Sequence, residues 1–290
     1  MSLALIEKAV EVAVRAARRA GALQAKYAGK PRSVETKRNV IDLVTEVDRA
    51  SERIIHQAIA RAFPDHGFRG EERTRTHPDA PYQWIVDPLD GTTNFVHGVP
   101  CFAVSIGLLD RGRVVAGVIY DPMRKETFSA IRGRGAWLNG RPMRVSKSRR
   151  LDQSMLSTGF SIKFREHPAP YLRWFTAFQM RCHAVRRSGS TAISLAYVAC
   201  GRQEGFYEQD LWPWDLAAGL LLVQEAGGRV SDYRNRPVQL EQGEVLASNG
   251  RVHAAMLGVL AHPTRARGAP QASPWHLRQR PTRGEHPAHA

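Results

Sequence analysis

One acidic turn constrains this chain more than any other feature of its sequence. Residues 84–95 read WIVDPLDGTTNF, so a short hydrophobic run leads directly into two carboxylates three residues apart. Pro88 and Gly91 are residues that favour a turn here. We therefore expect a buried strand that delivers Asp87 and Asp90 to one turn at its end.

The residues of this turn suit a phosphate and a hard cation. Gly91, Thr92 and Thr93 can open a helical turn, whose first N–H groups have no partner inside the helix and can bind a phosphate. Mg²⁺ prefers oxygen ligands, so the two carboxylates and the carbonyl of Leu89 are candidate ligands. Taken alone, such a turn is also explained by ordinary side-chain capping.

Three further acidic segments favour the metal interpretation. Glu71 and Glu72 are adjacent at the end of a predicted strand. Asp215 lies in the first turn of a predicted helix, where it could also be a plain N-terminal cap. Thr45 and Asp48 fit a capping box that opens another helix, and Asp48 could equally orient a water. Each segment has a structural explanation by itself, and together they point to a metal site.

Helical and extended patterns alternate along the chain. Apolar residues at helical spacing predict helices, and short apolar runs between turn signals predict strands. The predicted helices are 3–28, 46–62, 189–200, 215–226 and 250–260, and the predicted strands are 83–86, a meander within 101–131, 204–208 and 244–247. Hairpins flanked by helices indicate layered α and β structure around a mixed sheet.

The composition excludes some protein classes and leaves two kinds of partner open. The chain of 290 residues carries a formal net charge of +15, and a basic surface attracts phosphorylated metabolites as well as nucleic acid. Three scattered cysteines argue against a disulfide framework and for a reducing compartment, so we expect a cytoplasmic protein. No apolar run reaches the roughly eighteen residues of a transmembrane helix.

The composition also changes along the chain. We expect one catalytic domain over residues 1–261. Residues 262–290 contain five prolines and five arginines with almost no large apolar side chains. Such a segment cannot bury enough surface to offset the entropy of ordering. The sequence therefore predicts a basic, proline-rich, disordered tail.

Together these segments resemble the inositol monophosphatase family, and most closely its bacterial SuhB-like branch. The resemblance spans roughly residues 5–260 and rests on motifs in the family's order, which are DLVT at 42–45, GEE at 70–72, the whole of 84–100, GS at 189–190, and 214–228. It implies a layered α+β fold, the five-layer αβαβα sandwich shared with fructose-1,6-bisphosphatases. It also implies a homodimer, activation by two or three Mg²⁺ ions and inhibition by Li⁺.

The resemblance implies a role for each matching residue. The implied metal ligands are Glu71, Asp87, the carbonyl of Leu89, Asp90 and Asp215. The residues implied to act on the attacking water or to lie beside the metal are Thr92, Asp48, Glu71 and Lys37. The implied substrate-binding residues are Gly91, Thr92, Thr93, Gly189, Ser190, Thr191, Glu208 and Asp215. Thr191 departs from the family, which often has alanine there, and its hydroxyl could change substrate preference.

The implied activity is hydrolysis of inositol 1-phosphate or a similar small polyol- or sugar-phosphate monoester. Two close metal ions lower the pKa of a bound water and stabilise the attacking and leaving oxygens. We therefore expect direct attack by water without a covalent phosphoenzyme. Other phosphoryl-transfer classes fail on spacing, because the chain has no Cys-x5-Arg cradle, no Asp-x-Asp at the acidic turn and no P-loop.

Several alternatives remain open. Within the family they are histidinol-phosphate, fructose-1,6-bisphosphate and nucleotide-phosphate phosphatases. The nucleotide-phosphate branch commonly has lysine where this chain has Thr93, which favours the inositol branch. From another class, an RNA- or transcription-complex-binding protein with a secondary phosphatase activity would also use a basic surface. No RNA-binding motif occurs, and we interpret the arginine pairs at 149–150 and 186–187 as solvated faces.

Overall fold

The computed structural model of the chain describes residues 1–37 and 42–264. The helices are α1 (Leu3–Tyr27), α2 (Glu46–Ala62), α3 (Thr92–Val96), α4 (Pro168–Gln179), α5 (Thr191–Ala199), α6 (Pro213–Glu225) and α7 (His253–Ala261), with short 3₁₀ turns at Leu151–Gln153, Ile162–Arg165 and Leu240–Gln242. None of the helices in these two ranges is long and apolar enough to cross a membrane. The predicted tail lies outside the described residues from 265 onward.

The larger sheet carries the acidic turn. Its strands in spatial order are β10 (Arg141–Pro142), β9 (Gly135–Leu138), β8 (Glu126–Ile131), β7 (Arg113–Asp121), β6 (Ala103–Asp110), β5 (Tyr82–Asp90), β3 (Gly67–Gly70) and β4 (Arg75–Thr76). Neighbouring strands are antiparallel except β3 and β5, which are parallel with Gly70 opposite Val86. Because these two strands run in the same direction, Glu71 leaves β3 at the sheet end where Asp87 lies.

The smaller sheet carries the other half of the predicted site. Its strands in spatial order are β12 (Ala184–Arg186), β11 (Met155–Thr158), β13 (Gly205–Glu208), β15 (Val245–Ser248) and β14 (Arg229–Ser231). Strand β11 is parallel to β12 and β13, whereas β15 is antiparallel to β13 and β14. A separate antiparallel pair, β1 (Val34–Thr36) with β2 (Leu43–Thr45), lies before α2.

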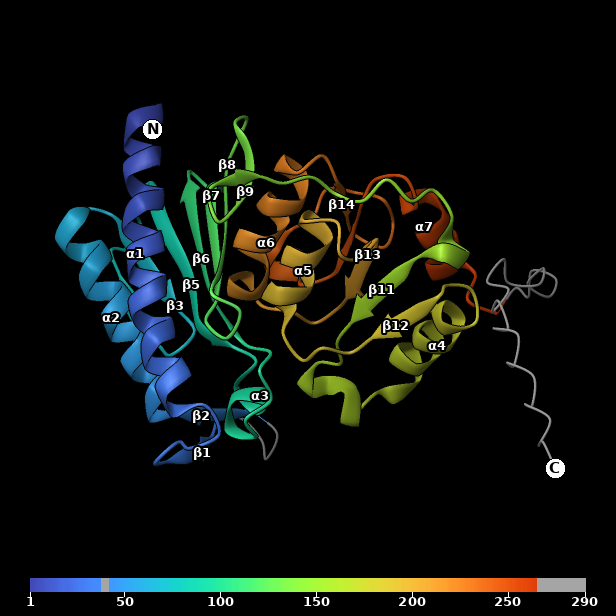
Figure 1. Ribbon diagram of the computed structural model, residues 1–290, viewed down its shortest axis with the longest axis horizontal. Coiled ribbons are helices and arrows are strands. Elements are labelled where there is room, and N and C mark those ends of the chain that lie inside the picture. The colour runs from blue at the N-terminus through green and yellow to red at the C-terminus, as the bar shows by residue number, and fades with distance from the viewer. Residues whose placement is uncertain (38–41, 265–290) are drawn as a thin grey trace, which may run out of the picture.

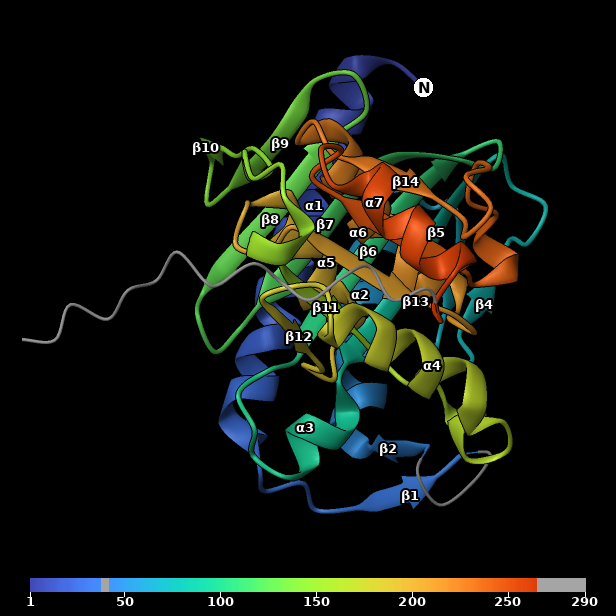
Figure 2. The same cartoon turned by 90° about the vertical axis from the view of Figure 1, so that its right-hand side faces the viewer.

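The sheets and helices alternate in five layers (Figure 1). Helices α1 and α2 cover the outer face of the larger sheet, and α5 and α6 lie between the two sheets. Helices α4 and α7 cover the far face of the smaller sheet, as the turned view also shows (Figure 2). The predicted αβαβα sandwich is therefore confirmed.

The central helix α6 lies against both sheets, and its composition reflects this. All of residues 216–223 are buried, as expected of a helix without a solvent face. A Cβ added at Gly117 of β7 would lie 2.8 Å from the carbonyl oxygen of Ala218. A Cβ at Gly107 of β6 would lie 2.7 Å from the Cβ of Ala217. These two glycines allow α6 to approach the larger sheet closely.

Some element boundaries differ from the predicted ones. Helix α5 begins at Thr191, two residues later than predicted, because Gly189 has a φ of +80° and Ser190 caps the helix. Helix α7 begins three residues later than predicted, because the side chain of Asn249 accepts two backbone N–H groups in the turn before it. Between residues 132 and 186 the sequence analysis assigned nothing, whereas the structure has β9 to β12 and α4 there.

Candidate active site

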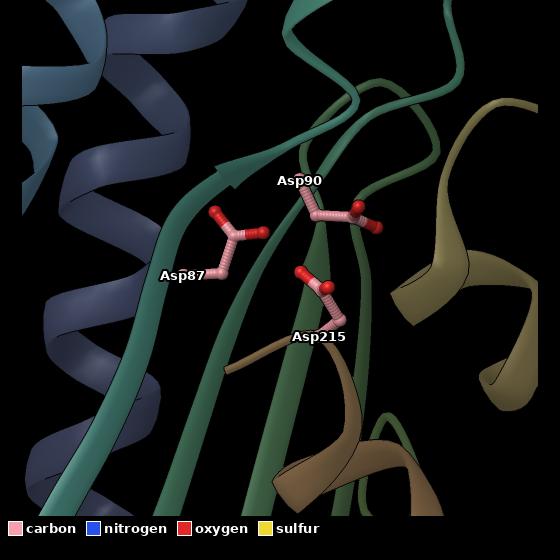
Figure 3. A group of neighbouring side chains, drawn as sticks. All are labelled: Asp87, Asp90 and Asp215. Atoms are coloured by element: carbon pink, nitrogen blue, oxygen red, sulfur yellow. The ribbon is translucent and has the colours of Figure 1, made fainter. Parts of the chain in front are cut away.

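Three carboxylates from two elements meet where β5 ends. Asp87 and Asp90 are three residues apart, a spacing that would place them on opposite faces of a regular strand. The pairing of β5 with β6 is irregular between these two residues, so both can face the same hollow. Asp215 joins them from the first turn of α6. One oxygen of each side chain lies within 4.8 Å of the others, and Figure 3 shows the three carboxylates gathered together.

Contacts at the start of α6 hold Asp215 in place. The backbone N–H of Trp212 donates to Oδ2 of Asp215 at 2.7 Å. The hydroxyl of Ser105 on β6 donates to the carbonyl oxygen of Trp214 at 3.1 Å. The guanidinium of Arg69 lies 5.5 Å from the centre of the Trp214 ring. The helix start that carries Asp215 is thus tied to both β6 and β3.

The carboxylate cluster carries more negative charge than its surroundings neutralise. Burial is the largest cause that raises the pKa of Asp87 and Asp215 well above the usual 3.8, and the charge of Glu71 comes next. Burial also raises the pKa of Asp90 to about 6, against the hydrogen bond from Ser190. A divalent cation would relieve this repulsion, and the buried carboxylates offer the oxygen ligands that Mg²⁺ prefers. The donor set therefore fits a metal site.

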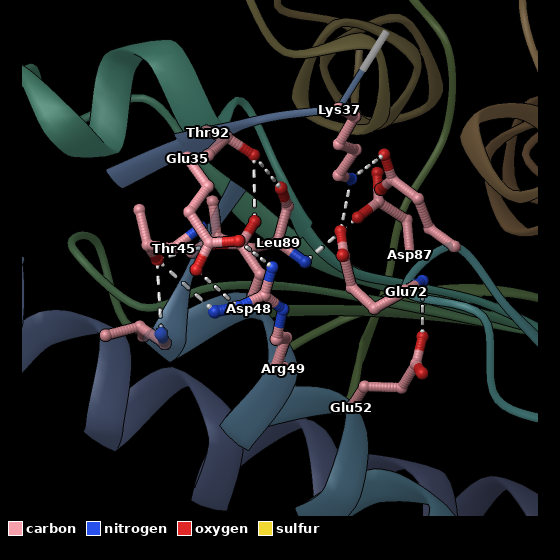
Figure 4. A network of polar contacts seen from close by, with 12 residues as sticks. Glu35, Lys37, Thr45, Asp48, Arg49, Glu52, Glu72, Asp87, Leu89 and Thr92 are labelled. Carbon is pink, nitrogen blue, oxygen red and sulfur yellow. Dashed lines mark hydrogen bonds and ion pairs between the residues drawn. The ribbon is translucent and has the colours of Figure 1, made fainter. Parts of the chain in front are cut away.

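Glu71 lies beside the cluster and is tied to Lys37. Its N–H donates to the carbonyl oxygen of Val86 at 3.0 Å, which continues the pairing of β3 with β5. The Nζ of Lys37 donates to Oε1 of Glu71 at 2.8 Å and also contacts Glu72 (Figure 4). Burial opposes the charge on Lys37, but the two glutamates together raise the pKa of its ammonium group. Lys37 therefore neutralises part of the local charge and fixes the carboxylate of Glu71.

Asp48 and Thr92 meet on the other side of the turn. Asp48 completes the predicted capping box of α2, since its Oδ2 accepts the N–H of Thr45 at 2.9 Å. The hydroxyl oxygen of Thr92 lies 3.0 Å from Oδ1 of Asp48 and 3.1 Å from the carbonyl oxygen of Leu89 (Figure 4). Burial raises the pKa of Asp48 to about 6, against the hydrogen bond from Thr45. The Thr92 oxygen can still accept a hydrogen bond from a water, which is the geometry needed to orient a nucleophile.

Gly91 connects β5 to α3, and the structure requires glycine at this position. Its φ is +96°, in the left-handed region that residues with a Cβ rarely adopt. A Cβ here would lie 2.9 Å from the carbonyl oxygen of Cys101 and 3.1 Å from that of Gly189. The tight turn therefore brings the acidic end of β5 against the segment that precedes α5.

The predicted residues line two adjoining hollows. A cavity of about 400 Å³ is lined by the predicted substrate-binding residues Thr93, Gly189, Ser190, Thr191 and Glu208. A second hollow of about 210 Å³ is lined by the predicted metal and phosphate residues Glu71, Asp87, Leu89, Asp90, Gly91, Thr92 and Asp215. Asp90 and residues 160–162 border both hollows, so the two sets of residues lie along one cleft.

Hydrogen bonds from the start of α5 connect the two hollows. Ser190 donates its hydroxyl to Oδ2 of Asp90, and the N–H of Ala192 reaches the same oxygen at 2.8 Å. The hydroxyl of Thr191 donates to Oε2 of Glu208 at 3.3 Å. Burial, followed by the charge of Asp90, raises the pKa of Glu208 to about 8. The hydroxyl that distinguishes Thr191 from alanine thus borders the larger cavity.

Some residues in or beside the cleft were not among the predicted site residues. Glu72 contacts Lys37, and burial raises its pKa to about 7; its position next to Glu71 was the available signal. Arg187 is exposed, as its assignment to a solvated face predicted, but it also lines the larger cavity. Its guanidinium lies 5.2 Å from the centre of the Phe160 ring, a contact between distant segments that no local pattern signals.

Comparison with known proteins agrees with this geometry. The profile of the inositol monophosphatase family matches residues 5–265. The chain belongs to this family. The match to individual members of the inositol monophosphatase family extends over most of their length.

Three relatives illustrate the range of the family. The chain is 46% identical to the Nus factor SuhB of Escherichia coli (strain K12) over 250 residues, which cover 86% of this chain and 94% of that protein. It is 44% identical to the inositol-1-monophosphatase of Synechocystis over 256 residues, which cover 87% and 88% of the two chains. The crystal structure of the extragenic suppressor protein suhB from Bartonella henselae superposes with a TM-score of 0.84 at 39% identity, over 88% of this chain and 99% of that one.

Proposed function

We propose that this family member is a Mg²⁺-dependent phosphatase that hydrolyses inositol 1-phosphate or a similar small polyol- or sugar-phosphate monoester. One observation carries the proposal. Asp90 borders both the acidic hollow and the neighbouring cavity of about 400 Å³. A phosphate held at the acidic hollow would therefore extend its alcohol group into a cavity of the size that binds a small molecule.

The chain supplies ligands for more than one cation. Glu71, Asp87 and the carbonyl of Leu89 would hold the first ion, and Asp87, Asp90 and Asp215 the second; Glu71 would also help to hold a weakly bound third ion. Bound Mg²⁺ would supply Lewis-acid stabilisation of the phosphoryl charge and would acidify a water. The burial of Asp87 and Asp90 and the raised pKa values of Asp87, Asp90 and Asp215 support this assignment. Binding of Li⁺ at the same ligands would inhibit the enzyme.

The residues around the metal site would position the reactants. Thr92, oriented by Asp48 at 3.0 Å, would accept a hydrogen bond from the attacking water and direct it toward phosphorus. The N–H groups of Gly91 and Thr92 at the start of α3 would bind the phosphate oxygens. Lys37 would keep Glu71 in place through their 2.8 Å hydrogen bond. Water would attack directly, so no phosphoenzyme would form.

The larger cavity would receive the alcohol. Thr93, Gly189, Ser190, Thr191 and Glu208 line it with hydroxyl, backbone and carboxyl groups that suit the hydroxyls of a polyol. The hydrogen bond between Thr191 and Glu208 would direct the free acceptor positions of Glu208 toward the substrate. Arg187 and Phe160 at the wall would limit how bulky a substituent can enter.

A phosphate-release assay on a panel of substrates tests the proposal. The panel contains inositol 1-phosphate, glycerol 2-phosphate, histidinol phosphate, fructose 1,6-bisphosphate and 3′-phosphoadenosine 5′-phosphate, each with Mg²⁺ and with or without Li⁺. We expect turnover of the polyol monoesters to be highest and to fall on addition of Li⁺. Preference for histidinol phosphate, the bisphosphate or the nucleotide would assign the chain to one of those activities instead.

Variants link that activity to the carboxylates. Asp90→Asn and Asp215→Asn should each lower kcat by a factor of roughly 10² or more with unchanged circular dichroism, because each removes a metal ligand. Asp79→Asn, on an exposed loop, is the matched control and should retain activity. Near-normal turnover in both cluster variants would contradict the ligand assignment.

The name Nus factor carried by the Escherichia coli relative favours a second function, association with a transcription complex. The net charge of +15 would support contacts with a nucleic-acid backbone. If this function exists, RNA binding should fall steeply with salt and should survive Asp90→Asn, since catalysis is not required for it. RNA binding that is independent of salt concentration, or no RNA binding at low salt, would rule out this second function. Sedimentation of the same protein would test the predicted homodimer.

A further inference from the structure

A second pocket lies at the opposite end of α6 from Asp215. Its volume is about 490 Å³, and none of the residues that line it lines the catalytic cleft. Its walls come from the last turns of α6, strand β14, the turn between β6 and β7, and the loop after β8. Gln224 lines it and lies nine residues after Asp215, or roughly 14 Å along a helix with a 1.5 Å rise per residue. The pocket is therefore separate from the metal site.

Four arginines surround this pocket, and within the part of the chain that the structure describes only Arg236 forms an ion pair with a carboxylate. Arg236 pairs with Asp232 at 2.6 Å, and Arg229 donates to the side-chain oxygen of Asn235 at 2.8 Å. Within residues 1–37 and 42–264, neither Arg113 nor Arg132 forms an ion pair with a carboxylate. The pocket thus has two guanidinium groups, those of Arg113 and Arg132, that form no ion pair within the described residues.

A hydrogen bond holds Arg132 in position, and no carboxylate of the described residues forms an ion pair with it. Its Nε donates to the carbonyl oxygen of Val114 at 2.5 Å, which orients the guanidinium and leaves the terminal nitrogens available. The nearby carboxylate of Glu225 accepts the N–H groups of Gly133 and Gly135 at 2.8 and 3.0 Å. Burial, followed by the charge of Arg113, lowers the pKa of Arg132, although the charge of Glu225 opposes both effects. The two arginines therefore repel each other, and an anion between them would relieve that repulsion.

The floor of the pocket is apolar. Leu220 and Leu221 of α6 and Val114 of β7 are buried beneath it, and Val230 and Val238 are half-buried at its sides. Such a floor suits a flat, weakly polar ring, and arginine also stacks on aromatic rings. A guanidinium can bind a phosphate through two parallel hydrogen bonds, so two free guanidiniums suit two phosphates. A ligand with both parts matches the pocket better than a free inorganic ion.

We propose that this pocket is a second ligand site, which binds a nucleoside diphosphate with its phosphates on Arg113 and Arg132 and its base on the apolar floor formed by α6 and β14. The volume of about 490 Å³ lies within the range of small-molecule sites. The site is independent of the proposed phosphatase activity, because none of its residues takes part in that chemistry.

Isothermal titration calorimetry of the full chain with ADP, in the presence of EDTA, tests this site. EDTA removes metal ions, so anions lose the cations that would hold them in the acidic hollow of the catalytic cleft. We expect one ADP per chain, competition by inorganic pyrophosphate, and binding of adenosine at least tenfold weaker. Arg113→Gln and Arg132→Gln should each weaken ADP binding by about tenfold or more, because each removes charged hydrogen bonds.

A matched variant distinguishes ADP binding at this pocket from the nonspecific attraction of ADP to a basic protein. Arg53→Gln, at an exposed position on α2, removes the same charge far from the pocket and should bind ADP as the original chain does. The exposed side chain of Arg113 forms no hydrogen bond or ion pair within the described residues, so its replacement leaves the fold intact even if that of Arg132 does not. The proposal is overturned by no binding at millimolar ADP, by equal binding of adenosine, or by equal losses in Arg53→Gln and Arg113→Gln.

Discussion

Replacing Asp87 by asparagine should stabilise the metal-free protein and weaken its response to Mg²⁺. Asp87 is 2% exposed, and one of its oxygens lies within 4.8 Å of oxygens of Asp90 and Asp215. Its Oδ1 accepts the N–H of Leu89 at 2.9 Å, and the amide oxygen of asparagine can keep that hydrogen bond. The substitution therefore removes a buried charge while retaining the local geometry.

The size of the effect follows from the cluster. At 4.8 Å and an effective dielectric constant of about 20, two unit charges repel by about 3.5 kcal/mol. Protonation sets an upper limit on this repulsion energy, because the carboxyl can bind a proton instead. For a carboxyl with the usual pKa of 3.8, protonation at pH 7 costs about 4 kcal/mol, at about 1.4 kcal/mol per pH unit. Removing the charge of Asp87 therefore stabilises the protein. The unpaired N–H groups of the buried asparagine amide offset about 1–3 kcal/mol of that stabilisation. We expect the free energy of unfolding to rise by roughly 1–3 kcal/mol at pH 7.

Urea unfolding followed by circular dichroism, in EDTA and in saturating Mg²⁺, measures both halves of the prediction. At a hundredfold excess over its dissociation constant, a bound ion stabilises the native state by about 2.7 kcal/mol. The original chain should gain this amount and Asp87→Asn much less, so the order of stability reverses when Mg²⁺ is added. Asp79→Asn is the exposed control and should change neither value. If the variant is less stable in EDTA, or gains as much from Mg²⁺ as the original chain, the repulsion argument is wrong.

Three further substitutions test other parts of the structure. Gly91→Ala places a Cβ 2.9 Å from a carbonyl oxygen at a φ of +96°, so thermal unfolding should show a loss of about 1–3 kcal/mol together with loss of activity. Arg69→Met removes the group that lies over Trp214 and pairs with Glu241; we expect roughly tenfold weaker activation by Mg²⁺ with little change in kcat at saturation, measured as activity against Mg²⁺ concentration. Burial lowers the pKa of His253 from 6.5 to about 4, so the unfolded chain binds the extra proton between these values and stability should fall by up to about 3 kcal/mol as pH drops from 6.5 to 4. The unfolding free energy of His253→Gln, measured across this pH range, should not show that fall. A pH dependence equal to that of the original chain would contradict the prediction.

The hydrogen bonds of His253 explain why its imidazole stays neutral. Ser231 donates its hydroxyl to the carbonyl oxygen of Asp232 at 2.7 Å, so it accepts from Nε2 of His253 at 3.0 Å. Ser248 accepts the N–H of Gly250 at 3.1 Å and can donate to Nδ1 at 2.9 Å. One ring nitrogen therefore donates and the other accepts. This arrangement suits a neutral ring, in agreement with the lowered pKa.

Patterns within about twelve consecutive residues carried most of the correct predictions. The acidic turn of residues 84–95, the capping box at Thr45 and the long amphipathic helix α1 were all predicted, because capping and helical periodicity depend on neighbours along the chain. In the smaller sheet, strands β13 and β15 were predicted, whereas β11, β12 and β14 were missed. Its strands are three or four residues long, and the pairing of β11 with β12 and β13 joins segments that carry no shared local signal.

The amino-acid sequence by itself determined the family, the carboxylates of the acidic cluster and the elements that carry them, because those follow from residue identity and local spacing. Tertiary structure alone decided which side chains meet. Parallel pairing of β3 with β5 sets Glu71 beside Asp87, and the glycines of the larger sheet let α6 bring Asp215 close. The contact of Arg187 with Phe160 and the pocket around Arg113 arise in the same way. Such contacts depend on the packing of layers distant in sequence, where distances of a few ångströms decide the electrostatics.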